Sequence, residues 1–408
     1  MKKYLILFWI MLTTNAYAEA TFTPLVAPSI KELNTILTAE RNSFSENHPK
    51  NYKMPHYSAA KNDIDIYKVS YDSIIPELNN KPIKATGLIA IPKLLNTSKL
   101  PVISYQHGTV FRKNDVPSNA FSDAKNPLSF ETRLMVAQFA SQGYIVIAAD
   151  YFGMGDSTEP ESYTLKASEQ QACLDLYKAS LAFLENEKSI IPSALFLSGW
   201  SKGGLVTTGF LEKLESLDIP VTAASTASSP NDLFAAMNGW IYKPRKIDAS
   251  WLNTLVALTV FSYENYLSKP GLAKDVLKTA YYDDLKKIYE RDFKDQTELL
   301  DILNRIPIKI KDILNDNYSN PSYFADSEYG KILASMQTYR RVFSTHVKMY
   351  YGDLDQVIFV PIGKLASSYQ ESMGSKTIDT EQVLAGDHHR TFLTAVAGQK
   401  KWFDTLIK

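Results

Sequence analysis

The chain has two kinds of hydrophobic pattern, and the first, an alternation of apolar and polar residues, lies within its first quarter. The alternation of Ile64 and Ile66 with aspartates predicts a strand with one polar face. Asn79 and Asn80 then form a sequence typical of a tight turn, and an apolar run follows at residues 87–91. We therefore predict two antiparallel strands at one edge of a sheet.

Further along the chain, short apolar runs alternate with longer stretches that have helical spacing. Runs of this kind are typical of a parallel sheet that is buried on both faces and whose strands are connected by helices. The predicted strands cover residues 101–105, 144–149, 194–197, 220–225, 347–351 and 377–384, and the predicted helices begin at Glu131, Leu165, Lys202 and Thr391.

The strand pattern stops between residues 231 and 343. This stretch has the spacing of helices and loops, and we expect its aromatic residues, such as Trp240 and Trp251, to form mainly its own hydrophobic core. We therefore predict an α/β fold in two parts. A mostly parallel central sheet flanked by helices covers residues 19–230 and 344–408, and a mainly helical cap, inserted before the strand at 347–351, covers residues 231–343.

The amino terminus has the pattern of a signal peptide, residues 1–18. Lys2 and Lys3 precede an apolar run at residues 4–12, and the small residues at 16–18 are suited to cleavage. The apolar run is too short to span a bilayer, and no other run reaches about 18 apolar residues. We expect an exported protein, periplasmic or secreted, without an integral membrane segment once the signal is removed.

Charge and cysteine content exclude several classes of protein. The 44 basic and 44 acidic residues give a formal net charge of zero, so no overall positive field favours a nucleic-acid partner. The single cysteine, Cys173, excludes an internal disulfide and a zinc site built from cysteines. Its place in a stretch of helical spacing favours a packing role over a nucleophilic one.

The clearest chemical signal is the sequence Gly199-Trp200-Ser201-Lys202-Gly203, which has the form GxSxG. It lies between an apolar run and a predicted helix, and its glycines allow a sharp turn without colliding side chains. A serine hydroxyl becomes a good nucleophile when its oxygen is exposed beside a general base. The alternative is a glycine-rich turn with a structural role only, but the flanking strand and helix favour a nucleophile.

A nucleophilic serine requires a histidine that acts as a base and an acid that orients this histidine. Asp353 and Asp355 directly follow the apolar run at 347–351, and both are candidates for the acid. His388 and His389 directly follow an aspartate after the last predicted strand. The remaining histidines have no such context: His48, His56, His107 and His346.

The order Ser201, Asp355, His388 resembles that of the α/β-hydrolase superfamily. The resemblance covers about residues 60–230 and 344–405. Three further motifs support it: Gly352-x-x-Asp355-x-x-Ile358, the sequence His107-Gly108-Thr109, which is similar to an oxyanion loop, and residues 150–157, which are similar to a D-x-x-G-x-G-x-S loop. The export signal, the HGT sequence and the helical insertion resemble those of secreted bacterial serine esterases and lipases.

The resemblance implies an α/β-hydrolase fold and a role for each motif residue. Ser201 is then the nucleophile, Asp355 the acid and His388 the base. The backbone N–H groups of Lys202 and Thr109 would form the oxyanion hole. By the same comparison, His107 is expected to fix the oxyanion loop.

Three alternatives remain for these roles. Asp353 competes with Asp355, and Asp232 is a weaker rival because some members place the acid after that earlier strand. His389 competes with His388 because the doubled histidine blurs the alignment. We do not expect the pair to bind a metal, since adjacent side chains rarely point at one ion and no third ligand accompanies them.

We therefore predict a serine hydrolase that cleaves carboxylic esters through an acyl-enzyme, needs no cofactor and acts on a small-molecule or lipid ester. A peptidase or amidase is the enzymatic alternative, because the same triad serves both bonds. A non-catalytic binding protein on this scaffold is a third possibility and predicts a missing triad member. The cap is either a lid that opens or a rigid part of the pocket.

Overall fold

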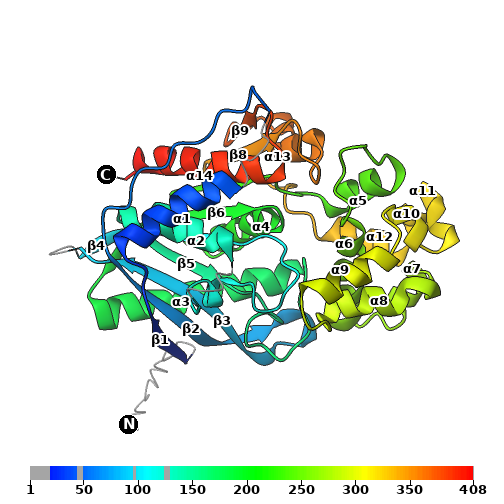
Figure 1. Ribbon diagram of the computed structural model, residues 1–408, viewed down its shortest axis with the longest axis horizontal. Coiled ribbons are helices and arrows are strands. Elements are labelled where there is room, and N and C mark those ends of the chain that lie inside the picture. The colour runs from blue at the N-terminus through cyan, green and yellow to red at the C-terminus, as the bar shows by residue number, and fades with distance from the viewer. Residues whose placement is uncertain (1–18, 44–48, 95–97, 124–128, 408) are drawn as a thin grey trace, which may run out of the picture.

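The computed structural model describes residues 19–43, 49–94, 98–123 and 129–407. The predicted signal peptide and His48 lie outside these ranges. A wide sheet with helices on both faces forms one side of the molecule, and a group of shorter helices lies beside one end of the sheet (Figure 1).

Within the described ranges, nine strands form one sheet in the order β1-β2-β3-β5-β4-β6-β7-β8-β9 (Figure 1). The pairs β1–β2, β2–β3 and β3–β5 are antiparallel, and every pair from β5 onward is parallel. The strands are β1 (Ala20–Leu25), β2 (Ile64–Ile75), β3 (Lys81–Pro92), β4 (Lys99–Gln106), β5 (Ile145–Ala149), β6 (Ile191–Trp200), β7 (Ala223–Ala227), β8 (Val347–Gly352) and β9 (Ile378–Val383). The predicted mostly parallel sheet with an antiparallel edge is confirmed.

The turn between β2 and β3 follows the sequence closely. Asn79 and Asn80 both adopt left-handed backbone angles, with φ of 55° and 58°. Asparagine tolerates this conformation better than most residues, which explains why the reversal occurs here. Every residue of β5 is buried, as its unbroken apolar run predicted.

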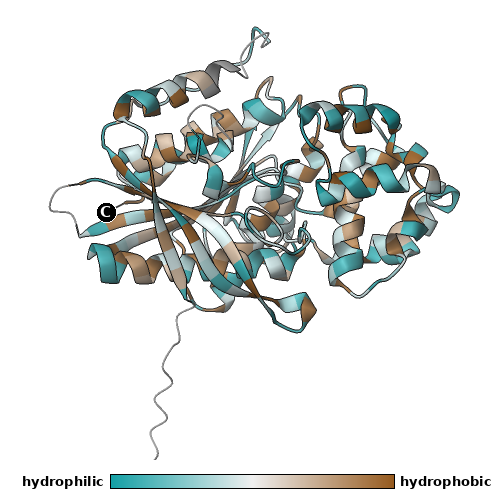
Figure 2. Ribbon diagram, turned by 60° about the horizontal axis from the view of Figure 1, so that its bottom comes forward, coloured by the Kyte–Doolittle hydropathy of each residue, from teal (hydrophilic) through white to brown (hydrophobic). Residues whose placement is uncertain are grey.

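Helices cover both faces of the sheet. One face packs against α1, α2 and α14, and the other against α3, α4 and α13. Figure 2 shows hydrophobic residues along the strands and hydrophilic residues on the outward turns of the helices. These helices are α1 (Ile30–Ser43), α2 (Phe130–Phe139), α3 (Lys166–Lys188), α4 (Lys202–Ser216), α13 (Val360–Ser372) and α14 (His388–Asp404). In the described ranges, no helix has both the length and the apolar character needed to cross a bilayer.

The chain between β7 and β8 is helical, and we call residues 233–335 the helical insertion. Its buried apolar side chains are continuous with the core under the α3 and α4 face of the sheet. The insertion comprises α5 (Leu233–Tyr242), α6 (Asn253–Tyr266), α7 (Leu272–Val276), α8 (Thr279–Glu290), α9 (Gln296–Arg305), α10 (Ile310–Ile313), α11 (Pro321–Asp326) and α12 (Glu328–Ser335).

Some boundaries differ from the sequence predictions. The last helix was expected from Thr391 but begins at His388, because the side chain of Asp387 accepts the N–H of Arg390 at 2.7 Å and caps the helix earlier. Strand β7 begins at Ala223 rather than at residue 220. The sequence pattern did not predict β1, α1 or α13.

Candidate active site

Ser201 lies at the sharp turn between β6 and α4. Its backbone has φ 55° and ψ −127°, which is uncommon for a residue with a side chain and positions the hydroxyl between the strand and the helix. The two glycines of the motif allow close packing at this turn. A Cβ atom on Gly199 would lie 2.2 Å from the carbonyl oxygen of Gly203, and one on Gly203 would lie 1.9 Å from that of Gln106.

A continuous chain of hydrogen bonds leads from Ser201 to Asp355. The Oγ atom of Ser201 lies 2.9 Å from Nε2 of His388. On the other side of the imidazole, Nδ1 lies 3.0 Å and 3.1 Å from the two carboxylate oxygens of Asp355. All three residues are buried, and Ser201, at 9% exposure, is the most accessible of them. The structure thus brings together three residues that are far apart in the sequence.

The environment of Asp355 favours its anion. Burial raises the pKa of this carboxyl, but the charge and hydrogen bond of His388, together with further hydrogen bonds such as that from the backbone N–H of Ile358, outweigh burial, so the pKa lies below its ordinary value. The backbone N–H groups of Val357 and Ile358 each donate to Oδ1 at 2.8 Å. A carboxylate held in this way can orient the imidazole and stabilise its protonated form.

The backbone of His388 is held by two residues that the sequence analysis did not single out. Nε1 of Trp200 donates to the carbonyl oxygen of His388 at 3.0 Å. The backbone N–H of His388 donates to Oε1 of Gln356, also at 3.0 Å. Trp200 directly precedes Ser201, and Gln356 directly follows Asp355. This adjacency to predicted site residues was the one sign of their role in the sequence.

The rival acids lie elsewhere. Asp353 is exposed, and its Oδ2 accepts a hydrogen bond at 3.5 Å from the side chain of Gln382. Asp232 caps the amino terminus of α5 by accepting the N–H of Ala235 at 2.9 Å. The carboxylate that meets His388 is therefore that of Asp355.

The other histidines also have distinct surroundings. His389 packs against the rings of Trp200 and Phe130, with centroid distances of 5.1 Å and 6.1 Å. Burial, together with the charge of His388, lowers the pKa of His389 to about 4. It is His388 that lies within hydrogen-bond distance of the serine. His56 and His346 are exposed.

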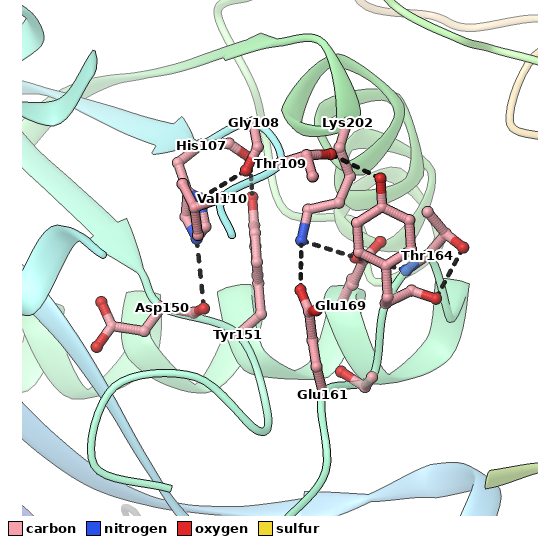
Figure 3. Close-up of polar contacts among 12 residues, drawn as sticks. His107, Gly108, Thr109, Val110, Asp150, Tyr151, Glu161, Thr164, Glu169 and Lys202 are labelled. Atoms are coloured by element: carbon pink, nitrogen blue, oxygen red, sulfur yellow. Dashed lines mark hydrogen bonds and ion pairs between the residues drawn. The ribbon is translucent and has the colours of Figure 1, made fainter. Parts of the chain in front are cut away.

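His107 is buried behind the loop that contains Thr109. Its Nδ1 lies 2.8 Å from the carbonyl oxygen of Gly108, its Nε2 lies 3.3 Å from that of Asp150, and its ring stacks on Tyr151 (Figure 3). Burial lowers the pKa of His107 to about 3, so the ring is neutral. These contacts fit the predicted role of fixing the loop.

The same loop is held by a buried carboxyl that the sequence analysis missed. Oε2 of Glu131 accepts the backbone N–H of Gly108 at 2.8 Å and the hydroxyl of Tyr105 at 2.6 Å. Burial raises the pKa of Glu131 to about 7. The backbone N–H of Thr109 follows Gly108 in this loop, and that of Lys202 lies at the start of α4. Among the described residues, neither N–H has a hydrogen-bond acceptor.

Two cavities meet at Ser201, and Thr109 and Trp251 also line both. The larger has a volume of about 300 Å³ and is lined by charged, polar and aromatic residues, among them Arg112, Asp115, Gln296 and Phe130. The smaller has a volume of about 30 Å³ and is mainly apolar, with walls that include Met237, Trp240, Leu255, Leu333 and Ile358. Trp240 and Trp251 of the insertion, which pack in or against its hydrophobic core, also line these cavities.

The described residues contain no cluster of three or more His, Cys, Asp or Glu side chains that is arranged to hold a metal ion. His388 and His389 are neighbours in sequence, but their rings are nearly perpendicular, with an interplanar angle of 84° and a centroid distance of 6.3 Å.

No protein-family model and no curated protein matches the sequence. The structure is similar to that of a candidate hydrolase from Legionella pneumophila, with a TM-score of 0.78, 21% identity and coverage of 95% of this chain and 97% of that one. A mutant of the rice cell wall degrading esterase LipA from Xanthomonas oryzae gives a TM-score of 0.77 at 19% identity, with coverage of 95% and 97%. Candida antarctica lipase A gives a TM-score of 0.62 at 14% identity, with coverage of 91% of this chain and 76% of that one.

These similarities establish the fold. The chain has the α/β-hydrolase fold, as the sequence motifs implied, and the likeness extends over nearly its whole length. One fold can carry many activities, so the chemistry of this protein depends on the residues around Ser201.

Proposed function

We propose that the protein is a serine hydrolase that cleaves carboxylic esters. The observation that carries this proposal is the chain of hydrogen bonds from Asp355 through His388 to Ser201, at a point where two cavities meet. Geometry of this kind lets a serine oxygen attack a carbonyl carbon while its proton leaves to a base.

In the first half of the reaction, Oγ of Ser201 forms a bond to the ester carbonyl carbon, and its proton moves to Nε2 of His388. This step requires the tautomer that carries hydrogen on Nδ1, and Asp355 favours it by accepting that hydrogen. The tetrahedral intermediate then loses the alcohol, which takes the proton from Nε2. The acyl group remains on Ser201.

In the second half, water attacks the acyl-enzyme while His388 again accepts a proton. The new tetrahedral intermediate releases the carboxylic acid, and Ser201 recovers its hydrogen from Nε2. In both halves we assign the oxyanion to the backbone N–H groups of Thr109 and Lys202. The latter is the first residue of α4, where N–H groups lack acceptors within the helix and the helix dipole favours negative charge.

The cavities indicate the class of ester. We assign the acyl group to the smaller, apolar cavity and the alcohol to the larger one. A volume of about 30 Å³ leaves room for only a few heavy atoms, so the cavity suits a short acyl chain. The larger cavity, with the charged side chains of Arg112 and Asp115 beside aromatic rings, suits a bulkier alcohol that is partly polar.

Esters are proposed over amides because the neighbouring structures include proteins named as an esterase and a lipase. We further propose that the helical insertion forms a cap over the site, since its residues Met237, Leu255 and Trp251 line the cavities. Export through a signal peptide at residues 1–18 remains part of the proposal, on the sequence pattern alone.

The test is hydrolysis of p-nitrophenyl butanoate by purified protein and by the Ser201→Ala variant. We expect the variant to lose activity and labelling by a fluorophosphonate probe, which reacts with an activated serine. Ser372→Ala, which changes an exposed serine in α13, is the matched control and should retain both. Equal turnover by Ser201→Ala would refute the assignment, and a faster rate on the matched butanoyl amide would favour an amidase.

A further inference from the structure

A cluster of buried charged side chains begins at Lys202, the residue after the nucleophile, and the proposed reaction assigns no step to these side chains. Nζ of Lys202 lies 3.4 Å from Oε1 of Glu161 and 3.6 Å from Oε1 of Glu169. Figure 3 shows the Lys202 side chain extending toward both carboxylates. Arg291 forms an ion pair with the other carboxylate oxygen of Glu161. The Lys202 and Glu161 side chains are each 2% exposed, and the side chain of Arg291 is 6% exposed.

Such a cluster is a costly way to stabilise a protein. Removing charged groups from water costs several kcal/mol for each ion, and well-packed apolar residues often stabilise a fold equally well. Buried charges are better suited to fixing one geometry, because each ion is acceptable only beside its partner. We therefore consider which part of the structure the Lys202–Glu161–Arg291 ion pairs hold in place.

One part of that geometry is the position of Lys202 itself. Its side chain extends from the first turn of α4 across the rings of Tyr151 and Tyr163, with Nζ 4.2 Å and 5.0 Å from the ring centroids. The backbone N–H of Lys202 is one of the two groups to which we assign the oxyanion. The ion pair with Glu161 therefore holds the residue that carries this donor.

The second donor is attached to the same segment of chain. Oγ1 of Thr109 and the hydroxyl of Tyr163 are 2.6 Å apart. Residues 160–164, which we call the bridging segment, thus contact Thr109 through Tyr163 and Lys202 through Glu161. Both proposed oxyanion donors depend on the position of these five residues.

The helical insertion also contacts the bridging segment, through three tyrosines and Arg291. The hydroxyl of Tyr266 donates to the carbonyl oxygen of residue 160 at 2.5 Å, and the hydroxyl of Tyr289 donates to that of residue 161 at 2.8 Å. The hydroxyl of Tyr263 lies 3.0 Å from Oγ1 of residue 164. Arg291, at the carboxyl end of α8, adds its ion pair and also donates to the carbonyl oxygen of Val110 at 3.3 Å.

We propose that the bridging segment is a positioning element that couples the helical insertion to both oxyanion donors, with Glu161 as its central residue. This inference rests on the proposed esterase function. Glu161 offers one carboxylate oxygen to Lys202 of the core and the other to Arg291 of the insertion. Through this carboxylate, a displacement of the insertion changes the position of the N–H groups that stabilise the transition state.

The test separates the oxyanion geometry from substrate binding and from stability. We expect Glu161→Gln, which keeps the shape but removes the charge, to lower kcat by about tenfold or more while KM changes less than twofold. Its affinity for a short alkyl trifluoromethyl ketone, which forms a tetrahedral oxyanion with the nucleophilic serine, should fall by the same factor as kcat/KM.

Tyr163→Phe tests the contact with Thr109 by a milder change, the removal of one hydroxyl, and should lower kcat by about threefold or more. This variant also serves as the test if Glu161→Gln proves too unstable to assay. The matched control is Glu328→Gln, which removes an exposed ion pair with Lys269 within the same insertion and should leave kinetics unchanged. An active wild-type enzyme whose Glu161→Gln and Tyr163→Phe variants keep kcat and inhibitor affinity within twofold would overturn the inference. A wild-type protein without Ser201-dependent turnover would instead overturn the proposed function.

Discussion

At the scale of single residues, the tautomer of one imidazole decides whether the site works. Oδ1 of Asp355 already accepts the N–H groups of Val357 and Ile358, so the side chain cannot turn without losing two hydrogen bonds. Its carboxylate therefore presents only acceptors to Nδ1 of His388. This keeps the hydrogen on Nδ1 and leaves Nε2 free to take the proton of Ser201.

We accordingly expect Asp355→Asn to lower kcat by about 10³- to 10⁴-fold with little change in the fold. The amide oxygen would keep the two backbone hydrogen bonds, and the amide nitrogen would then donate to Nδ1 and force the wrong tautomer. Steady-state kinetics with p-nitrophenyl butanoate measure the loss of kcat, and circular dichroism checks that the fold is retained. Asp353→Asn, two residues away and exposed, is the control, and a comparable loss there would contradict the assignment.

Glu131 permits a prediction about pH. Burial raises its pKa from 4.5 to about 7, with Asp115 adding to the rise while hydrogen bonds from Tyr105 and Gly108 and the charge of Lys202 oppose it. The folded state therefore binds this proton more tightly than the unfolded state, so the contribution of Glu131 is most favourable below about pH 4.5 and is lost as pH rises to 7. A shift of this size corresponds to about 3 kcal/mol.

Glu131→Gln should remove that contribution. We expect the free energy of unfolding of the wild type to fall more between pH 5 and pH 8 than that of the variant, by about 1–3 kcal/mol. Urea unfolding at the two pH values measures this difference. Glu169, whose pKa burial also raises to about 7, remains in both proteins and so cancels in the comparison. Parallel pH dependences would show that Glu131 is not the responsible group.

The residues that the sequence could predict are those whose roles depend on local pattern. Three short motifs each locate one residue to within a few positions: GxSxG, the glycine three residues before Asp355, and the Asp-His pair. The structure places Ser201 and Asp355 within hydrogen-bond distance of His388. Glu131 and Glu161 have no such pattern. They matter through contacts with Gly108 and Lys202, which are 23 and 41 residues away in sequence.

At the scale of elements, the turn between β6 and α4 depends on how closely two pieces of backbone approach. Gly203 lies in the first turn of α4, where a Cβ atom would meet the carbonyl oxygen of Gln106 at 1.9 Å. Neither this glycine nor Gly199 has a positive φ. Both are therefore required by lack of space and not by backbone angles.

Gly203→Ala should for this reason destabilise the protein by about 2 kcal/mol or more, because backbone has to move. Gly209, in the same helix, provides a matched control, since the nearest neighbour of an added Cβ is a methyl group of Thr338 at 3.4 Å. Gly209→Ala should be neutral or stabilising by up to about 1 kcal/mol, as expected for a helix interior. Urea unfolding compares the two, and equal stabilities would contradict this account of the turn.

Elements were predictable where the hydrophobic pattern was strong. The buried central strands consist mainly of apolar residues, and the parallel arrangement followed from the helices between them. β1 was not predicted because half of its six residues are exposed and it lies at the sheet edge. α14 begins earlier than its apolar pattern because the capping aspartate, and not hydrophobicity, sets its first residue.

At the scale of the whole molecule, the site is divided between the sheet core and the helical insertion. The core contributes the hydrogen-bonded residues at the carboxyl ends of β6 and β8 and at the start of α14. The insertion contributes Met237 and Leu255 to the apolar cavity next to Ser201. Substitutions in this apolar wall are thus expected to change acyl selectivity while the three hydrogen-bonded residues of the core stay in place.

Acyl-chain preference tests this division. With about 30 Å³ available, the wild-type enzyme should prefer p-nitrophenyl acetate, propanoate or butanoate, and kcat/KM should fall by at least about tenfold between the butanoate and octanoate esters. Met237→Ala removes a buried side chain from the cavity wall and should move the optimum toward longer chains, at a cost of about 2–5 kcal/mol of stability. The exposed Met373→Ala, in contrast, should leave the optimum unchanged. An optimum at long chains in the wild type, or one that Met237→Ala does not move, would mean that the acyl group occupies the larger cavity instead, because Ser201 opens onto both.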